Sequence, residues 1–376
     1  MRVSRSFITG VSCMLLGLTA GAARAVETHG SPAHGFLETL RHHTMLTSTV
    51  PANGDQNPYA VIVAPVSAGK IQKDDVLISN FNNSGNLQGL GTTIVDYNPT
   101  TKQLTEFAAI PRHLPACPGG IGLTTAMTML QSGWVIVGSL PSQDGTTATK
   151  GGGCLLLLDS QGHLAGTFTG PDINGPWGNM AVVDHGTTAI LFVSNTGFGV
   201  TAPGQDVVNK ATVLRLELAI PAGQAPRITA QTVVGAGFGE QADKDVFIVG
   251  PTGLALGANG TLYVSDAIGN RIVAIDNAIL RTDSAGTGRE VTKNGFLKRP
   301  LALALAPNGD LLAVNGLNGE VVEIDPSGHQ LYAQWVDPNK AQSPAGSGDL
   351  FGIAVTPHGD GFYYVEDEVN ALVLAH

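Results

Sequence analysis

Short apolar runs separated by turn residues recur along the second half of the chain. The clearest unit begins with the apolar run 250–256, passes through Asn259-Gly260 into 262–266, and ends with 271–276. An Asn-Gly pair between two apolar runs is a strong signal for a tight β-hairpin. Runs of this length are typical of strands and too short for ordinary helices. The unit therefore predicts three antiparallel strands joined by short turns.

The same unit occurs six times along the chain. Copies at 300–325 and 351–374 keep the pattern closely, and looser copies begin near Pro58, Thr124 and Trp177. The second strand of each copy ends in a polar residue: Asn80, Ser139, Asn195, Asp266, Asn315 and Asp367. We interpret this column as side chains that cap strand ends by binding turn amides, with a ring of ligands as the alternative. The segment between two copies supplies a fourth strand.

Six four-stranded sheets arranged around an axis form a β-propeller. We therefore predict an all-β fold, a six-bladed β-propeller over residues 44–376. The last copy ends at His376 after its third strand, so its fourth strand must come from elsewhere. The β-prone segment 44–50 precedes the first copy, and we expect this N-terminal strand to close the ring.

The repeat resembles the NHL family of propellers and, more distantly, the SMP-30/gluconolactonase and streptogramin-lyase groups. The residues that carry the resemblance are 251–255, Asn259-Gly260 and 263–266, and it is strongest over 245–370. The resemblance implies the propeller fold. Such propellers include hydrolases, lyases and pure binding modules, so it leaves the activity open.

The N-terminus has the features of a secretory signal peptide. Arg2 and Arg5 precede an apolar stretch at 7–18, and Ala23-Arg24-Ala25 matches a cleavage motif. We expect residues 1–25 to be removed, residues 26–43 to be a lead-in, and the mature protein to be secreted into a bacterial periplasm. A retained N-terminal anchor is the alternative.

Composition narrows the classes of partner. Charged residues make up only 13% of the chain and apolar residues 43%, which disfavours both a coiled coil and a disordered protein. Loss of the three arginines of the leader takes the formal charge from −10 to −13. Such a charge disfavours binding to nucleic acid or to an anionic membrane. We expect a monomer that binds a small molecule or another protein.

Two cysteines, Cys117 and Cys154, remain in the mature chain. An isolated pair in an oxidising compartment favours a disulfide, and two buried free thiols are the alternative. Neither cysteine belongs to a zinc, thioredoxin or haem motif.

The loops between the second and third strands are long in the first three blades, at 81–92, 140–153 and 196–210. They share a face with the loops that enter the channel strands, so we expect a binding face walled by blades one to three. Neutral surface insertion is the alternative explanation, because lengthening a flexible loop costs little.

The resemblance also implies where a metal would bind. Calcium-dependent lactonases of the related groups hold the ion with Glu, Asn and Asp side chains on channel strands. The equivalent columns here contain no carboxylate, and only Asn179 matches that chemistry. We therefore predict no metal and no cofactor, and the channel strands give calcium no support.

Several other residues are candidates for ligand binding. Tyr59, Trp177 and Phe351 fall at the channel mouth and could stack on a flat ligand, with packing of a narrow channel as the alternative. Asp349, in a loop entering a channel strand, is a candidate acid together with Asp172. His113, in an entrance loop, is a candidate base.

The sequence thus supports two main hypotheses of function. The first is a ligand- or protein-binding module that uses the face walled by blades one to three. The alternative is a lactonase-like hydrolase or lyase at the channel mouth, which would need at least three convergent polar groups there. A structural domain that associates through an apolar surface patch is a third hypothesis. Whether the protein is an enzyme stays open at this level.

Overall fold

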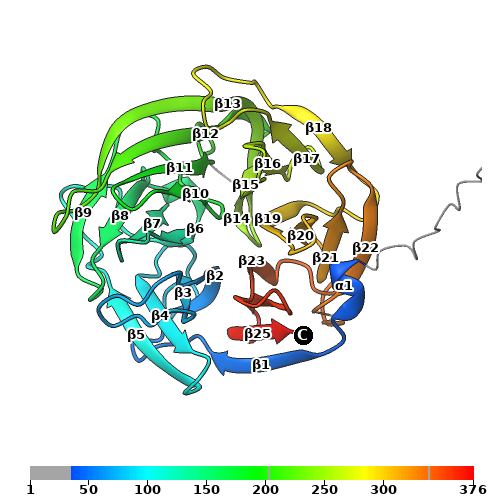
Figure 1. Ribbon diagram of the computed structural model, residues 1–376, viewed down its shortest axis with the longest axis horizontal. Helices are drawn as coiled ribbons and strands as arrows, with labels where there is room; N and C mark the ends of the chain where they lie inside the picture. The colour runs from blue at the N-terminus through cyan, green and yellow to red at the C-terminus, as the bar shows by residue number, and fades with distance from the viewer. Residues whose placement is uncertain (1–34, 202–203, 338) are drawn as a thin grey trace, which may run out of the picture. The chain divides into compact units, whose positions relative to one another are not determined.

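The structure is a computed structural model that describes residues 35–201, 204–337 and 339–376 (Figure 1). The predicted signal peptide, 1–25, and the first half of the predicted lead-in, 26–34, lie outside the described residues. Six antiparallel sheets are arranged around a central axis, five with four strands and one with five. The predicted six-bladed β-propeller is therefore confirmed. Among the described residues, no helix is long and apolar enough to cross a membrane.

We number the blades I to VI from the first complete repeat, with the innermost strand first. Blade I consists of β2 (Gln56–Val63), β3 (Val76–Asn82), β4 (Thr93–Asn98) and β5 (Gln103–Ala109). Blade II consists of β6 (Leu123–Met129), β7 (Val135–Ser139), β8 (Cys154–Leu158) and β9 (Leu164–Phe168). Blade III consists of β10 (Ala181–Asp184), β11 (Thr188–Asn195), β12 (Val208–Ala219), β13 (Arg227–Asp243) and β14 (Phe247–Val249).

The second half of the ring is more regular. Blade IV consists of β15 (Pro251–Leu256), β16 (Leu262–Asp266), β17 (Arg271–Ile275) and β18 (Arg289–Lys293). Blade V consists of β19 (Pro300–Leu305), β20 (Leu311–Asn315), β21 (Glu320–Ile324) and β22 (Gln330–Trp335). Blade VI consists of β23 (Leu350–Val355), β24 (Phe362–Glu366), β25 (Ala371–Ala375) and β1 (His43–Ser48). The helices described are short, α1 (Phe36–Thr39) and the 3-10 turn η1 (Thr147–Thr149).

The N-terminal strand closes the ring, as the sequence predicts. β1 pairs antiparallel with β25, with Thr44 opposite Leu374, so blade VI combines both ends of the chain. The preceding segment is also anchored. The backbone N–H groups of Phe36 and Leu37 donate to the buried carboxylate of Glu323 at 2.7 and 2.9 Å. Closure therefore uses a strand pair and a charged anchor.

Serine side chains near the ends of second strands join neighbouring blades. Ser79 accepts the N–H of Ala60 at 3.1 Å and donates to the carbonyl of Thr124, on the next inner strand, at 2.9 Å. Two more serines, Ser194 and Ser265, repeat this arrangement. These hydrogen bonds hold the inner strand of one blade in register with the inner strand of the next blade.

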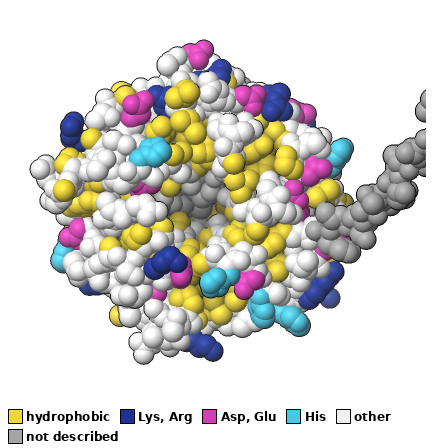
Figure 2. Space-filling model, in the orientation of Figure 1, with side chains coloured by type: hydrophobic (Ala, Val, Ile, Leu, Met, Phe, Trp, Pro, Cys, Tyr) yellow, Lys and Arg dark blue, Asp and Glu magenta, His cyan; other side chains and the backbone are white. Residues whose placement is uncertain are grey.

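The neighbouring polar column contains strand-end caps, as expected. Asn315 donates to the carbonyl of Phe296 at 2.9 Å and accepts the N–H of Lys298 at 2.8 Å. Asp266 accepts the N–H of Gly269 at 3.0 Å. Figure 2 shows the surface of one side of the propeller, where charged side chains are sparse among apolar and uncharged ones. This matches the low charged fraction of the chain.

Candidate functional site

The hairpin formed by β13 and β14 closes the mouth of the central channel. Its last turn places Phe247 beside the axis, where the ring centroid lies 5.4 Å from Phe81 and 6.2 Å from Trp177. Phe247 is almost fully buried and has a φ of +66°, a strained conformation for a bulky residue. Val246 and Ile248 fill the space beside it. The channel is therefore packed with side chains at this end.

The predicted aromatic residues lie beneath this hairpin. Tyr59, Trp177 and Phe351 are 0%, 2% and 3% exposed. The ring of Tyr59 is stacked between Phe351 at 3.8 Å and Phe81 at 4.4 Å. These faces are used by neighbouring rings, so a ligand could reach them only after displacing the hairpin. In this structure they pack the channel, which is the alternative considered from the sequence.

Asn179 lies where it connects three blades. Its amide donates to the carbonyls of Leu254 and Leu303 at 2.8 and 3.0 Å, and its oxygen accepts the N–H of Leu303 at 3.0 Å. Since Asn179 precedes β10, these bonds link blades III, IV and V. The structure thus gives Asn179 a structural role, and its amide groups are occupied by backbone.

A group of carboxylates lies at the edge of the channel in blade VI. Asp337 follows β22, Asp349 directly precedes β23, and Glu366 is the last residue of β24. One oxygen from each of the three lies within 4.8 Å of the others, and all three residues are buried. We call Asp337, Asp349 and Glu366 the acidic cluster. It contains Asp349, the acid predicted from the sequence.

The surroundings of the acidic cluster are polar. Gln342 donates to Asp349 at 2.6 Å, and Asn339 donates to Asp349 at 3.5 Å and to Glu368. None of the ion pairs among the described residues includes a carboxylate of the cluster. Oδ2 of Asp337 and Oε1 of Gln342 are buried and have no hydrogen-bond partner among those residues. The negative charge is thus balanced only by amide groups.

Burial and mutual repulsion raise the pKa values here. Burial, then the nearby carboxyl of Asp349, raises the pKa of Asp337 to about 6. Burial, then repulsion from Asp337 and Asp349, raises the pKa of Glu366 to about 7. The same causes, burial first, raise the pKa of Asp367 well above its usual range. The raised pKa values mean that ionisation of these carboxyl groups lowers the stability of the folded protein.

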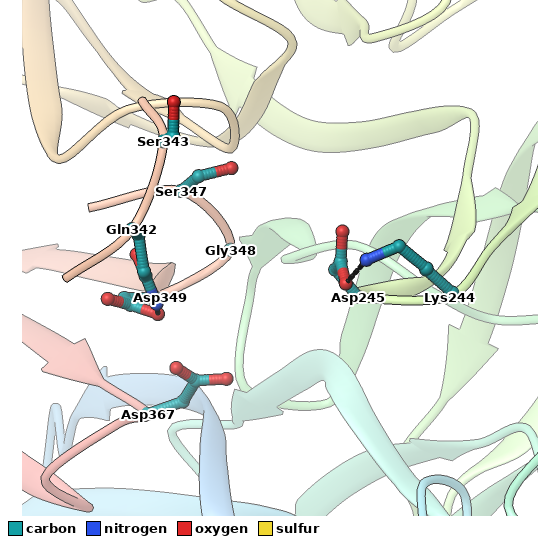
Figure 3. Close-up of a pocket in the computed structure, with 8 residues that line it drawn as sticks. All are labelled: Lys244, Asp245, Gln342, Ser343, Ser347, Gly348, Asp349 and Asp367. Atoms are coloured by element: carbon teal, nitrogen blue, oxygen red, sulfur yellow. Dashed lines mark hydrogen bonds and ion pairs between the residues drawn. The ribbon is translucent and has the colours of Figure 1, made fainter. Parts of the chain in front are cut away.

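A pocket of about 450 Å³ opens beside the acidic cluster (Figure 3). Asp349 and Asp367 form one side, and the ion-paired Lys244 and Asp245 of the hairpin turn form the other. The remaining lining residues come from one loop: Gln342, Ser343, Ser347 and Gly348. Because Asp349 belongs to both, a group held by the acidic cluster would be reached from this pocket.

The other predicted residues lie in blade II and in the loops that enter blades II and III. His113 lines two hollows, with Arg112 also lining the larger one. Cys117 and Cys154 are joined by a disulfide that ties this entrance segment to β8. Asp172 accepts a hydrogen bond from Gln231 at 2.6 Å. The structure does not bring His113, Asn179 and Asp349 together.

Sequence reasoning missed Asp337 and Glu366. The aligned columns began at the position of Thr252, whereas Asp349 lies two residues earlier in its repeat. Glu366 precedes the capping column by one residue, and Asp337 follows an outer strand. The available signal was the acidic run Glu366-Asp367-Glu368 at the end of a second strand, where the other repeats carry at most one acidic residue.

Comparisons with known proteins support the fold. No protein-family model and no curated protein matches the chain. A putative oxidoreductase (glucose dehydrogenase) of Thermus thermophilus superposes with a TM-score of 0.53 at 15% identity, covering 89% of this chain and 99% of that one. A gluconolactonase of Xanthomonas campestris gives 0.51 at 12% identity, covering 89% and 88%. At such identities the likeness shows the propeller fold and no more, which agrees with the predicted distant similarity to gluconolactonase-like propellers.

Proposed function

We propose that this protein is a cation-dependent binding module. The acidic cluster would hold a calcium ion, and the adjoining pocket would take a small polar ligand. The observation that carries the proposal is the convergence of three buried carboxylates from three separate segments within 4.8 Å. This keeps the binding function expected from the sequence but moves its centre from blades I–III to blade VI.

The residues present fit a hard divalent cation. Calcium prefers oxygen ligands from carboxylates, amides and water, and tolerates irregular geometry. Asp337, Asp349 and Glu366 supply carboxylates, and the unpartnered Oε1 of Gln342 is an amide oxygen close to Asp349. The described part of the cluster contains no histidine or cysteine, so softer metals are disfavoured. A cation would also remove the repulsion that raises the pKa of Glu366.

The pocket fits a small ligand with several hydroxyl groups. Its lining offers the hydroxyls of Ser343 and Ser347, the amide of Gln342 and the carboxylate of Asp367. No aromatic residue lines it, so stacking on a flat apolar ligand is disfavoured there. About 450 Å³ lies within the range of small-molecule sites.

Lactonase-like hydrolysis is a second candidate, and one observation favours it. Asp349 faces both the cluster and the pocket, so a ligand carbonyl in the pocket could approach a cation held there. A bound divalent cation polarises such a carbonyl and stabilises the charge that develops on its oxygen. Asp349 would then hold the ion, while Ser347 and Gln342 would orient the ligand.

Calorimetric titration of the chelator-treated protein with calcium tests the proposal. We expect one binding event for the wild type, a loss of at least tenfold in affinity for Asp349→Asn, and no change for the exposed control Asp283→Asn. Absence of calcium binding by the wild type would refute the proposal. A panel of lactones, assayed with calcium and with chelator, then decides the second candidate. Calcium-dependent hydrolysis that Asp349→Asn abolishes would establish an enzyme.

A further inference from the structure

A second hollow region lies over the disulfide of blade II. Two adjoining pockets of about 430 and 320 Å³ share His113, Pro118 and Gly120. We call these two pockets together the blade II hollow. None of the residues assigned to the cation site lines it, so it stands apart from the function proposed above.

The blade II hollow opens on the same face as the acidic pocket. Gln88 donates to the carbonyl of Asp245, which lines the acidic pocket, at 2.9 Å. Two residues further, Leu90 lines the blade II hollow. The N–H of Ser142, another lining residue, donates to the carbonyl of Gly89 at 2.9 Å. The hairpin turn and the loop of Gln88 therefore separate two pockets of one surface.

The charge of the blade II hollow is opposite to that of the acidic pocket. Its lining contains no acidic residue, whereas Arg112 and His113 lie side by side in it. Among the described residues, neither side chain has a hydrogen-bond or ion-pair partner. In a chain with a formal charge of −10, a concave site with an unpaired arginine and no acid attracts anions.

The base of the hollow is held in place. Cys117 is buried and bonded to Cys154, and its N–H donates to the carbonyl of Leu114 at 3.0 Å. The N–H of Gly120 donates to the carbonyl of Cys117 at 3.0 Å. A loop that is already ordered loses less entropy when a ligand binds.

We propose that the blade II hollow binds the carboxylate or phosphate group of a small anionic ligand. Arg112 would form the main contact, because the planar guanidinium pairs with two oxygens of either group. His113 contributes a second nitrogen donor from the adjacent position, and the side chain of Gln143 lies at the rim. The two cavities leave room for the rest of the molecule beyond its anionic end.

Calorimetric titrations with inorganic phosphate and with succinate, both in chloride buffer, test the proposal and distinguish the two chemistries. We expect the wild type to bind at least one of them. Arg112→Gln should weaken that binding at least tenfold. Arg112→Lys should weaken it less, because lysine keeps the positive charge although it lacks the planar guanidinium that pairs with two oxygens. Arg227→Gln, which changes an exposed arginine on β13, is the matched control and should bind as the wild type does.

Two outcomes would overturn the proposal. One is a wild type that binds neither anion, and the other is Arg112→Gln binding with unchanged affinity. Melting temperatures of the variants establish that the fold is retained, since Arg112 is exposed and has no structural partner. Anion binding that persists in Asp349→Asn shows that the blade II hollow acts independently of the cation site, so the two proposals can fail separately.

Discussion

Replacement of Glu366 by glutamine should stabilise the protein in the absence of a divalent cation. Burial and the neighbouring carboxylates raise the pKa of Glu366 from 4.5 to about 7. A carboxyl whose pKa is raised on folding binds its proton more tightly in the folded state. Its favourable contribution is therefore full below about pH 4.5 and is lost as the pH rises through 7. Glutamine is nearly isosteric and carries no charge, so the variant avoids this loss.

The size of the effect follows from the shift. Each pKa unit corresponds to about 1.4 kcal/mol, so ionisation of Glu366 at pH 8 costs up to about 3 kcal/mol. With an unfolding entropy of about 2.1 cal/mol/K per residue over about 340 residues, this cost corresponds to a melting temperature up to about 4 °C higher for Glu366→Gln. The difference should vanish near pH 4.5. Saturating calcium should reverse its sign, because the variant lacks one of the proposed ligands.

Thermal melts of the wild type and Glu366→Gln, followed by circular dichroism at pH 5 and pH 8, measure these differences in chelator and in calcium. Glu106→Gln, at an exposed position of β5, controls for a general change in charge. A variant no more stable than the wild type at pH 8 in chelator would show that Glu366 carries no such cost. If Glu366→Gln raised the melting temperature equally at pH 5 and pH 8, repulsion between ionised groups would not be the source of the added stability.

Three further changes test the fold around the site. Replacing Cys117 and Cys154 by serine should lower the free energy of unfolding by about 4 kcal/mol, because the disulfide joins residues 37 positions apart in the sequence. Denaturant unfolding of the wild type and the double variant measures this difference. Phe247→Ala should cost about 3–5 kcal/mol through the cavity left at the channel mouth, and a cost below about 1 kcal/mol would mean that the hairpin does not plug the channel. Asn179→Ala should cost about 1–3 kcal/mol by leaving backbone groups of Leu254 and Leu303 unpaired, whereas Asn209→Ala, at an exposed position of β12, should cost less.

Much of the fold could be predicted because its signals are local and repeated. The Asn259-Gly260 turn and its flanking apolar runs define a three-stranded unit by themselves, and six copies of it require a closed ring. The missing fourth strand of the last copy then predicted the pairing that β1 makes with β25. Only the fifth strand of blade III departs from the pattern, since the 17 residues of β13 continue past the blade edge and return as β14.

The site was less predictable because the repeat does not specify its residues, although Asp337, Asp349 and Glu366 lie within one stretch of the chain. Asp349 was found because it enters a channel strand, but Asp337 follows an outer strand of the preceding blade. The pairing of β23 with β24, in which Leu350 lies opposite Glu366, places Asp349 beside Glu366. Tyr59 and Phe351, in contrast, are far apart in the sequence, and their rings stack at 3.8 Å because β2 of blade I lies beside β23 of blade VI.

A second pair of buried acids has a structural role and offers a comparison with the acidic cluster. Glu323 and Asp310 are also buried near each other, and the pKa of Asp310 is raised to about 6 by burial and by Glu323. Glu323, however, accepts the N–H groups of Phe36 and Leu37, so its charge anchors the N-terminal segment.

The acidic cluster differs because its donors leave one carboxylate oxygen unpaired, although Oδ1 of Asp337 accepts the N–H of Asn339 at 3.1 Å. Oδ2 of Asp337 is buried with no donor among the described residues, and the neighbouring amides bind Asp349 and Glu368. A buried carboxylate oxygen without a donor destabilises the fold, and local departures of this kind concentrate at functional sites. If a cation binds at the cluster, calcium should raise the melting temperature more at pH 8 than at pH 5, by an amount that increases with its concentration. Melts at both pH values therefore distinguish a cation site from a merely unfavourable arrangement of acids.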